Sequence, residues 1–203
     1  MYYPSGVNDY GSGVSVSYFP VGTEPAQLEQ LLHHEACGHG FAKLADEYAY
    51  EYMGAVPADY VSQTQTQQRD WGWWKNVDFT SDPAAVLWAK FIADERYKYD
   101  GLGAFEGGLT YWSGVWRPTE DSIMRYNVGG FNAPSREAIY YRIHKLAYGD
   151  SWTYDYEKFV EWDSINRKSS AAQAASRPMV FKPYEPTAPP VVVGKSWREA
   201  LGR

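Results

Sequence analysis

The sequence has little cysteine, no excess of basic residues and no long apolar run, and each shortage excludes a class of protein. Cys37 is the only cysteine among 203 residues, so intrachain disulfides cannot hold the fold together. The net charge of −6 argues against nucleic acid as the main partner. No apolar run approaches the ~20 residues that span a bilayer, so we expect no membrane span. The N-terminus also lacks the charged start and apolar core of a signal peptide.

Aromatic residues, in contrast, are abundant, with nine Trp and eighteen Tyr. A chain of this length can bury one sizeable core, and we expect a monomer with one globular domain over residues 1–168. From residue 169 the chain turns Ala/Ser-rich and then Pro-rich, which predicts an extended tail over 169–203.

The most informative segment is a cluster of histidines and carboxylates. His34 and His39 flank Glu35, and Asp46 and Glu47 follow shortly after. Imidazoles and carboxylates are the ligands of catalytic zinc, and a glutamate beside the first histidine is placed to act as a base on water. We therefore predict Zn²⁺ as the cofactor, with Glu35 as the catalytic base. A helix with buried, hydrogen-bonded histidines is the alternative.

The spacing of the two histidines departs from the common H-E-x-x-H motif. Four residues offset two side chains by about 40° around an α-helix, whereas the five residues here offset them by about 140°. A one-residue π-type bulge would restore a shared face, and Gly38 lowers its cost. The pattern H-E-x-x-G-H also resembles the zinc motif of the dipeptidyl peptidase III family, so we predict the bulge. An accidental motif, or Glu35 and His39 as the ligand pair, are the alternatives.

Local patterns predict the remaining elements. Alternation indicates a strand over 14–19, and Thr23-Glu24-Pro25 starts the helix that carries His34. We expect a surface excursion over 49–82 and a mainly irregular segment over 100–118. Further helices are predicted over 82–92, 132–149 and 154–162.

A second motif lies at residues 121–126 (DSIMRY). A Met among polar residues usually fills a gap in the core. Following a zinc motif, however, the segment resembles the Met-turn of metzincin peptidases, of which the astacins carry S-I-M-H-Y. The resemblance implies that Tyr126 lies near the zinc with a role in the transition state; a core aromatic is the alternative.

Residues 38–48 (GHGFAKLADEY) resemble the active-site segment of the metzincin-like family that includes the bacterial immunoglobulin A peptidases, G-H-S-F-G-G-L-A-D-E-Y. Further matches lie, in the same order, at 105–108, 116–118 and 134–139, so the resemblance spans about 14–147. Two departures are the extra residue between the histidines and Ala42, where metzincins carry Gly.

The resemblance implies an α+β fold of the metzincin type. It would comprise a small N-terminal sheet, an active-site helix and a mainly helical or irregular C-terminal subdomain. It implies that Asp46 is the third zinc ligand, with Glu47 as runner-up and more suited to holding a histidine N–H. It also implies a secreted, periplasmic or cell-surface setting. Because metzincins carry more strands before this helix, we expect the chain to be a fragment of a longer protein.

The function predicted from these motifs is that of a zinc-dependent endopeptidase acting on proteins or peptides. The alternative is an inactive or truncated relative that binds proteins or glycans, which the aromatic cluster Trp71-Gly72-Trp73-Trp74 motivates. Glu35 favours catalysis, since a binding module has no use for the base. No role is assigned to Glu106.

Overall fold

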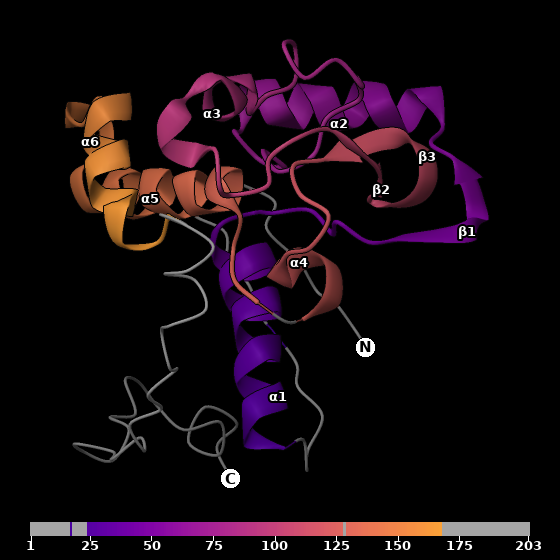
Figure 1. Ribbon diagram of the computed structural model, residues 1–203, viewed down its shortest axis with the longest axis horizontal. Helices are drawn as coiled ribbons and strands as arrows, with labels where there is room; N and C mark the ends of the chain where they lie inside the picture. Colours follow the sequence, from indigo (N-terminus) through magenta and orange to yellow (C-terminus); the bar gives the residue numbers. More distant parts are fainter. Residues whose placement is uncertain (1–16, 18–23, 128, 168–203) are drawn as a thin grey trace, which may run out of the picture.

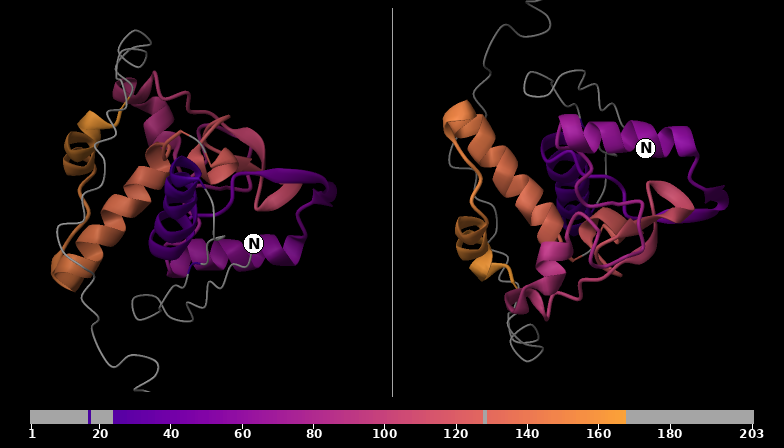
Figure 2. Two further views of the ribbon diagram at one scale, coloured as in Figure 1. Left: turned by 90° about the horizontal axis from the view of Figure 1, so that it is seen from below. Right: turned by 90° about the horizontal axis from the view of Figure 1, so that it is seen from above.

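A computed structural model describes residues 17, 24–127 and 129–167. A continuous helical rod, α1 (Pro25–Leu31) followed by the π-helix η1 (Leu32–Phe41), stands at the centre. The sheet lies on one side of the rod, and α5 (Ala133–Tyr148) and α6 (Tyr156–Trp162) lie on the other (Figures 1 and 2). The strand predicted over 14–19, except Ser17, and the tail predicted over 169–203 lie outside the described residues.

The sheet has three strands, β1 (Ala49–Ala55), β2 (Phe105–Gly108) and β3 (Thr110–Arg117). Their order is β1-β3-β2, with β1 parallel and β2 antiparallel to β3. All three follow the histidine helix in sequence. The described sheet is therefore distinct from the N-terminal sheet that we expected.

The surface excursion expected over 49–82 contains regular structure, and the segment 100–118 was wrongly predicted to be mainly irregular. Residues 49–82 contain β1 and the helix α2 (Ala58–Asp70), and residues 100–118 contain β2 and β3. In the second segment Gly107, Leu109 and Thr110 all have positive φ, so the strand-to-strand connection interrupts the period-2 pattern. The pairing of β1 with β3 joins residues about sixty positions apart, which a local pattern cannot reveal.

The helix predictions are largely confirmed. Asn132 caps α5 by accepting a hydrogen bond from the Ser135 N–H, and Gly149 follows its last residue with positive φ. The short helix α6 begins after Asp155, which caps it. The helix predicted over 82–92 is only α3 (Ala89–Ala93), because Asp82 and the residues after it form turns.

The remaining helical elements are short. They are α4 (Ile123–Tyr126), η2 (Glu95–Tyr97), η3 (Gly149–Ser151) and η4 (Asp163–Ile165). No helix within the described part of the chain is long and apolar enough to cross a bilayer.

Three buried clusters form the core. The largest joins α3, α5 and α6 around Trp88, Phe91 and Phe159. A second, which includes Leu44 and Met124, lies between η1, α4 and α5. A third packs Ala45 against Val77 and Val115 of the sheet region. The expected α+β class is confirmed, and the histidine segment lies where the helical part and the sheet meet (Figure 1).

Candidate metal centre

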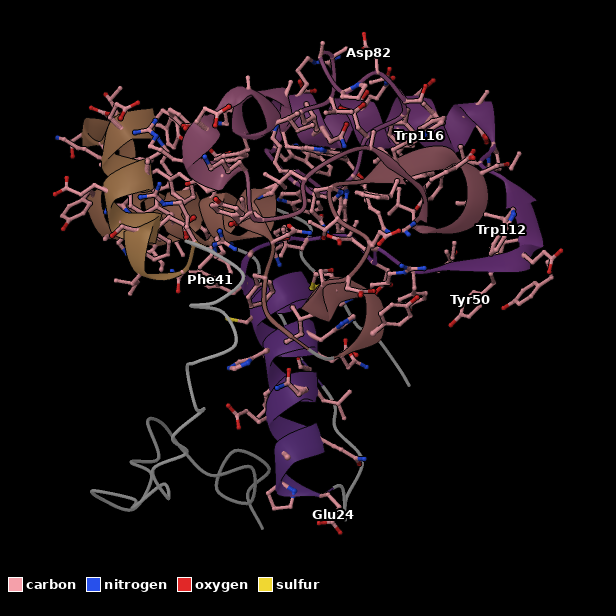
Figure 3. The ribbon with its side chains drawn as sticks, in the orientation of Figure 1. Glu24, Phe41, Tyr50, Asp82, Trp112 and Trp116 are labelled. Carbon is pink, nitrogen blue, oxygen red and sulfur yellow. The ribbon has the colours of Figure 1, made fainter. Side chains whose placement is uncertain are left out.

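The helix that carries both histidines is a π-helix over Leu32–Phe41, so the predicted distortion is present and extends beyond a single bulge. A π-turn joins residues five apart, as in the 2.9 Å hydrogen bond from the Ala42 N–H to the Cys37 carbonyl. The same spacing separates His34 from His39, and their ring centroids lie 4.8 Å apart. Glu24 and Phe41 mark the two ends of the rod in Figure 3. The five-residue spacing therefore brings the rings to one face.

Three ligand-type atoms converge on this face. The Nε2 atoms of His34 and His39 lie 3.1 Å apart, and Asp46 Oδ1 lies 3.1 Å from the first and 3.0 Å from the second. Ligand atoms bound tetrahedrally to zinc at 2.0–2.1 Å lie about 3.3 Å from one another. The observed triangle is within a few tenths of an ångström of that geometry, and it brings together the three residues predicted as ligands.

The other ring nitrogens determine what the triangle can bind. His34 Nδ1 lies 2.7 Å from the Ile123 carbonyl oxygen, and His39 Nδ1 lies 2.7 Å from that of Leu44. Because a carbonyl oxygen only accepts, both Nδ1 atoms carry the proton. In the neutral rings both Nε2 atoms then present lone pairs, toward each other and toward Asp46. Three acceptors this close together favour positive charge between them, either a metal cation or a proton on one imidazole.

The pKa shifts of Asp46 and His39 also indicate that positive charge is favoured at this position. Burial alone would raise the pKa of Asp46, but its hydrogen bonds to His34 and His39 outweigh that effect and hold the pKa well below its usual range. Burial alone would lower the pKa of His39, but the hydrogen bond to Asp46 outweighs it and raises the pKa. A divalent cation supplies that charge without protonating the rings.

Asp46 is held in place by its neighbours on both sides. Asn76 accepts a 2.8 Å hydrogen bond from the Ala45 N–H and donates to the Ala45 carbonyl at 2.9 Å. The Asp46 carbonyl accepts from the Leu109 N–H at 2.8 Å. Asn76 is therefore a positioning residue that the sequence analysis missed. It lies 31 residues from Ala45, and no local signal marks it.

Glu47, the runner-up for third ligand, makes its contacts away from the triangle, and its expected role as the partner of a histidine N–H is wrong. Its fully buried carboxylate accepts hydrogen bonds from Ser122 Oγ at 2.6 Å, Asn76 Nδ2 at 2.8 Å and Asn132 Nδ2 at 2.9 Å. The two imidazole N–H groups instead donate to backbone carbonyls. Glu47 thus joins the loop that carries Asp46 to the segments on either side of Met124.

Met124 lies directly beneath the π-helix. It is fully buried, and a Cβ built on Gly38 would lie 2.4 Å from its Sδ atom. Its carbonyl accepts a 2.9 Å hydrogen bond from the Glu47 N–H, while the preceding carbonyl, of Ile123, holds His34. The segment over 121–126 therefore supports the helix from below.

Glu35 lies beside the triangle. It is 5% exposed, and the potential ligand atoms of His34, Glu35 and His39 lie within 4.8 Å of one another. Burial raises the pKa of its carboxyl group. A carboxylate of raised pKa at this distance is suited to accept and return a proton. Asp46, which contacts both imidazoles, completes the triangle better than Glu35 does.

No protein-family model matches the sequence, and no curated protein is significantly similar to it.

Tyr126, predicted to act in the transition state, is 51% exposed, with its ring centroid 4.4 Å from the Arg125 guanidinium carbon. It lines a pocket of about 240 Å³ with Tyr48, Arg117 and Arg125, and none of the three triangle residues lines that pocket. A different tyrosine, Tyr60 of α2, lies close enough to the triangle for the charge of Asp46 to affect its pKa. Burial raises its pKa, and the charges of Tyr111 and Asp46 raise it further.

The structure also shows the contacts of Glu106 and of the aromatic cluster. Glu106 Oε1 accepts a 3.0 Å hydrogen bond from the Gly114 N–H, so this acid has a structural contact within the sheet. In the aromatic cluster Trp73 is buried, whereas Trp71 is 38% exposed, and their ring centroids lie 4.7 Å apart. The aromatic cluster is thus part core and part surface.

Proposed function

We propose that this protein is a zinc-dependent endopeptidase in which His34, His39 and Asp46 hold the metal and Glu35 is the general base. The observation that carries the proposal is the triangle of acceptor atoms, 3.0–3.1 Å apart, with both Nδ1–H groups already used by carbonyl oxygens. In a buried histidine pair without a metal, a proton on one imidazole would have to supply the positive charge that this arrangement favours.

The donor set fits zinc better than the commoner hard cations. Two imidazoles and one carboxylate are a catalytic zinc set with one position left for water, whereas Mg²⁺ and Ca²⁺ select oxygen ligands. When bound, zinc supplies a Lewis acid that acidifies water and polarises a peptide carbonyl. The family resemblance adds the peptide substrate and the setting outside the cytoplasm.

The chain's own residues supply the proton transfers. The Leu44 and Ile123 carbonyls hold both imidazoles in the tautomer that leaves Nε2 free to bind the metal. Glu35 accepts the proton of the attacking water and delivers it to the leaving amine, so its raised pKa serves both steps. We assign the transition-state contact to Tyr126 by resemblance. Tyr60 is the alternative, because the charge of Asp46 contributes to raising the pKa of its hydroxyl.

Metal content and activity, measured on the same samples, test the proposal. We expect about one zinc per chain by elemental analysis, lost in His39→Ala and retained in Glu35→Gln. Cleavage of casein should fall about 10²–10⁴-fold in Glu35→Gln, the usual contribution of a general base. Glu51→Gln changes an exposed acid on β1 and should leave both readings unchanged.

The outcomes separate the candidate functions. Zinc bound in the parent chain without cleavage of any protein substrate would favour the binding module over the peptidase. Absence of zinc after reconstitution with the metal would overturn the metal site itself. Comparison of Tyr126→Phe with Tyr60→Phe would decide which hydroxyl contributes to turnover.

A further inference from the structure

A second cavity, of about 440 Å³, lies away from the metal triangle. Its walls come from the end of α2, the loop that contains the aromatic cluster, α3 and the first half of α5. Ala42 and Lys43, directly after η1, also line it, but His34, His39 and Asp46 do not. A volume of this size suits a small organic molecule. We call it the basic pocket.

Positive charge dominates the walls of the basic pocket. Of the residues that the structure describes, five cationic side chains and two acids, Asp70 and Glu137, line it. The acids already pair within the pocket, Asp70 with Arg69 at 2.7 Å and Glu137 with Lys90. The other cations are Lys43, Lys75 and Arg142. Among the described lining residues cations thus outnumber acids, whereas the whole chain has a net charge of −6.

The pKa values of two lysines in the pocket are lowered. Burial, followed by the charge of Arg142, lowers the pKa of Lys43 to about 8. Burial is also the main cause that lowers the pKa of Lys75. A bound anion would relieve both effects.

One wall of the basic pocket is aromatic. Trp71 and Tyr141 are each 38% exposed there, and Trp73 is only 7% exposed. Lys43 Nζ lies 5.9 Å from the Trp73 ring centroid, at cation–π distance. Trp73 therefore contributes the edge of its ring system to the wall rather than an exposed polar group.

We propose that the basic pocket binds a small organic anion, a phosphate or carboxylate carried on a flat ring. The charged group pairs with Lys43, Lys75 and Arg142, and the ring stacks on the exposed face of Trp71. The proposal is independent of the peptidase function, since none of the metal ligands takes part.

Calorimetric titration with 2-naphthyl phosphate tests both parts of the proposed ligand. We expect one molecule bound per chain, with inorganic phosphate and 2-naphthol each binding at least about tenfold more weakly, because each retains only one of the two contacts. Equal affinity for inorganic phosphate would overturn the role of the ring. Absence of saturable binding at millimolar probe would overturn the site.

Variants place the binding in the basic pocket. Lys43→Gln and Lys75→Gln should each weaken 2-naphthyl phosphate about tenfold, and Trp71→Ala should weaken it while leaving inorganic phosphate unchanged. Lys98→Gln, an exposed lysine outside the pocket, is the matched control. His39→Ala should bind the probe as the parent does, which separates this site from the metal centre. Unchanged affinity in both pocket lysine variants, with thermal unfolding intact, would refute the proposal.

Discussion

The carboxylate of Glu47 shows how much one buried residue can organise. Its hydrogen-bond partners Asn76, Ser122 and Asn132 belong to three separate segments, and all of them donate to it. Burial raises the pKa of Glu47, while these three donors act in the opposite direction. In the structure all three of these side chains donate to the Glu47 carboxylate. The site therefore depends on a residue that touches no metal ligand through its side chain.

Replacement of Glu47 by Gln should destabilise the protein although the shape is conserved. The new amide NH₂ would face the NH₂ groups of Asn76 and Asn132 or the Ser122 hydroxyl, leaving at least one donor unsatisfied. We expect a loss of about 2 kcal/mol in the free energy of unfolding. That loss corresponds to about 4–8 °C in Tm by thermal denaturation for a chain of this size.

The control for Glu47→Gln is Glu51→Gln, which removes one carboxylate from an exposed position on β1. An exposed substitution of this kind should change stability by less than about 0.5 kcal/mol. If Glu47→Gln unfolds at the same temperature as the control, the hydrogen-bond network around Glu47 does not stabilise the loop as described.

At the scale of elements, the π-helix and the turn at Met124 form one packed unit. Gly38 is the contact point, because its missing side chain leaves room for the Met124 thioether. The His34 N–H, through the Ile123 carbonyl, ties the same two elements together. Spacing within the helix sets the face that the histidines share, and the turn below sets their orientation.

Gly38→Ala should therefore be costly. The added Cβ would lie 2.4 Å from Met124 Sδ, so the methionine must move within a packed core. Overpacking of this kind costs about 1–3 kcal/mol. We expect a lower urea midpoint and weaker zinc binding, with partial recovery in the double variant Gly38→Ala/Met124→Ala.

Gly130→Ala provides the matched control, since no atom lies within 4 Å of a Cβ built at that position. It should unfold near the midpoint of the parent chain. Weakening by Gly38→Ala that the Met124→Ala change does not relieve at all would contradict a direct clash between the two elements.

On the scale of the whole molecule, the proposed metal site joins the helical part to the sheet part. His34 and His39 come from η1, and Asp46 comes from the loop that leads into β1. Figure 3 shows Tyr50 and Trp112 projecting from the outer part of the sheet, well away from the rod that carries the histidines. A ligand held between these parts stabilises only the folded arrangement.

Zinc should consequently raise the unfolding temperature. A ligand present at about 1,000 times its Kd adds about 4 kcal/mol, which corresponds to about 8–16 °C for a domain of this size. Differential scanning calorimetry with and without chelator measures the shift. Magnesium should produce none, because it disfavours imidazole ligands. An equal zinc shift in His39→Ala would show that the ion binds elsewhere.

Features set by contacts between residues close in sequence were predicted correctly, whereas features set by long-range contacts were not. The Asn132 cap and Gly149 identified α5, and the five-residue spacing of the histidines indicated the π-helix, because capping and helical periodicity act within a few residues. The sheet was missed because glycines and residues of positive φ hide the alternation in 100–118.

The sequence by itself determined which reactive side chains are present, since His34, Glu35, His39 and Asp46 are of the types that catalytic zinc sites use as ligands and base. Only the tertiary structure decided that Asp46 completes the triangle and that Glu47 does not. The contacts responsible span long separations, 89 residues from His34 to Ile123 and 85 from Glu47 to Asn132. Such contacts form through packing of the whole chain, so no local pattern encodes them.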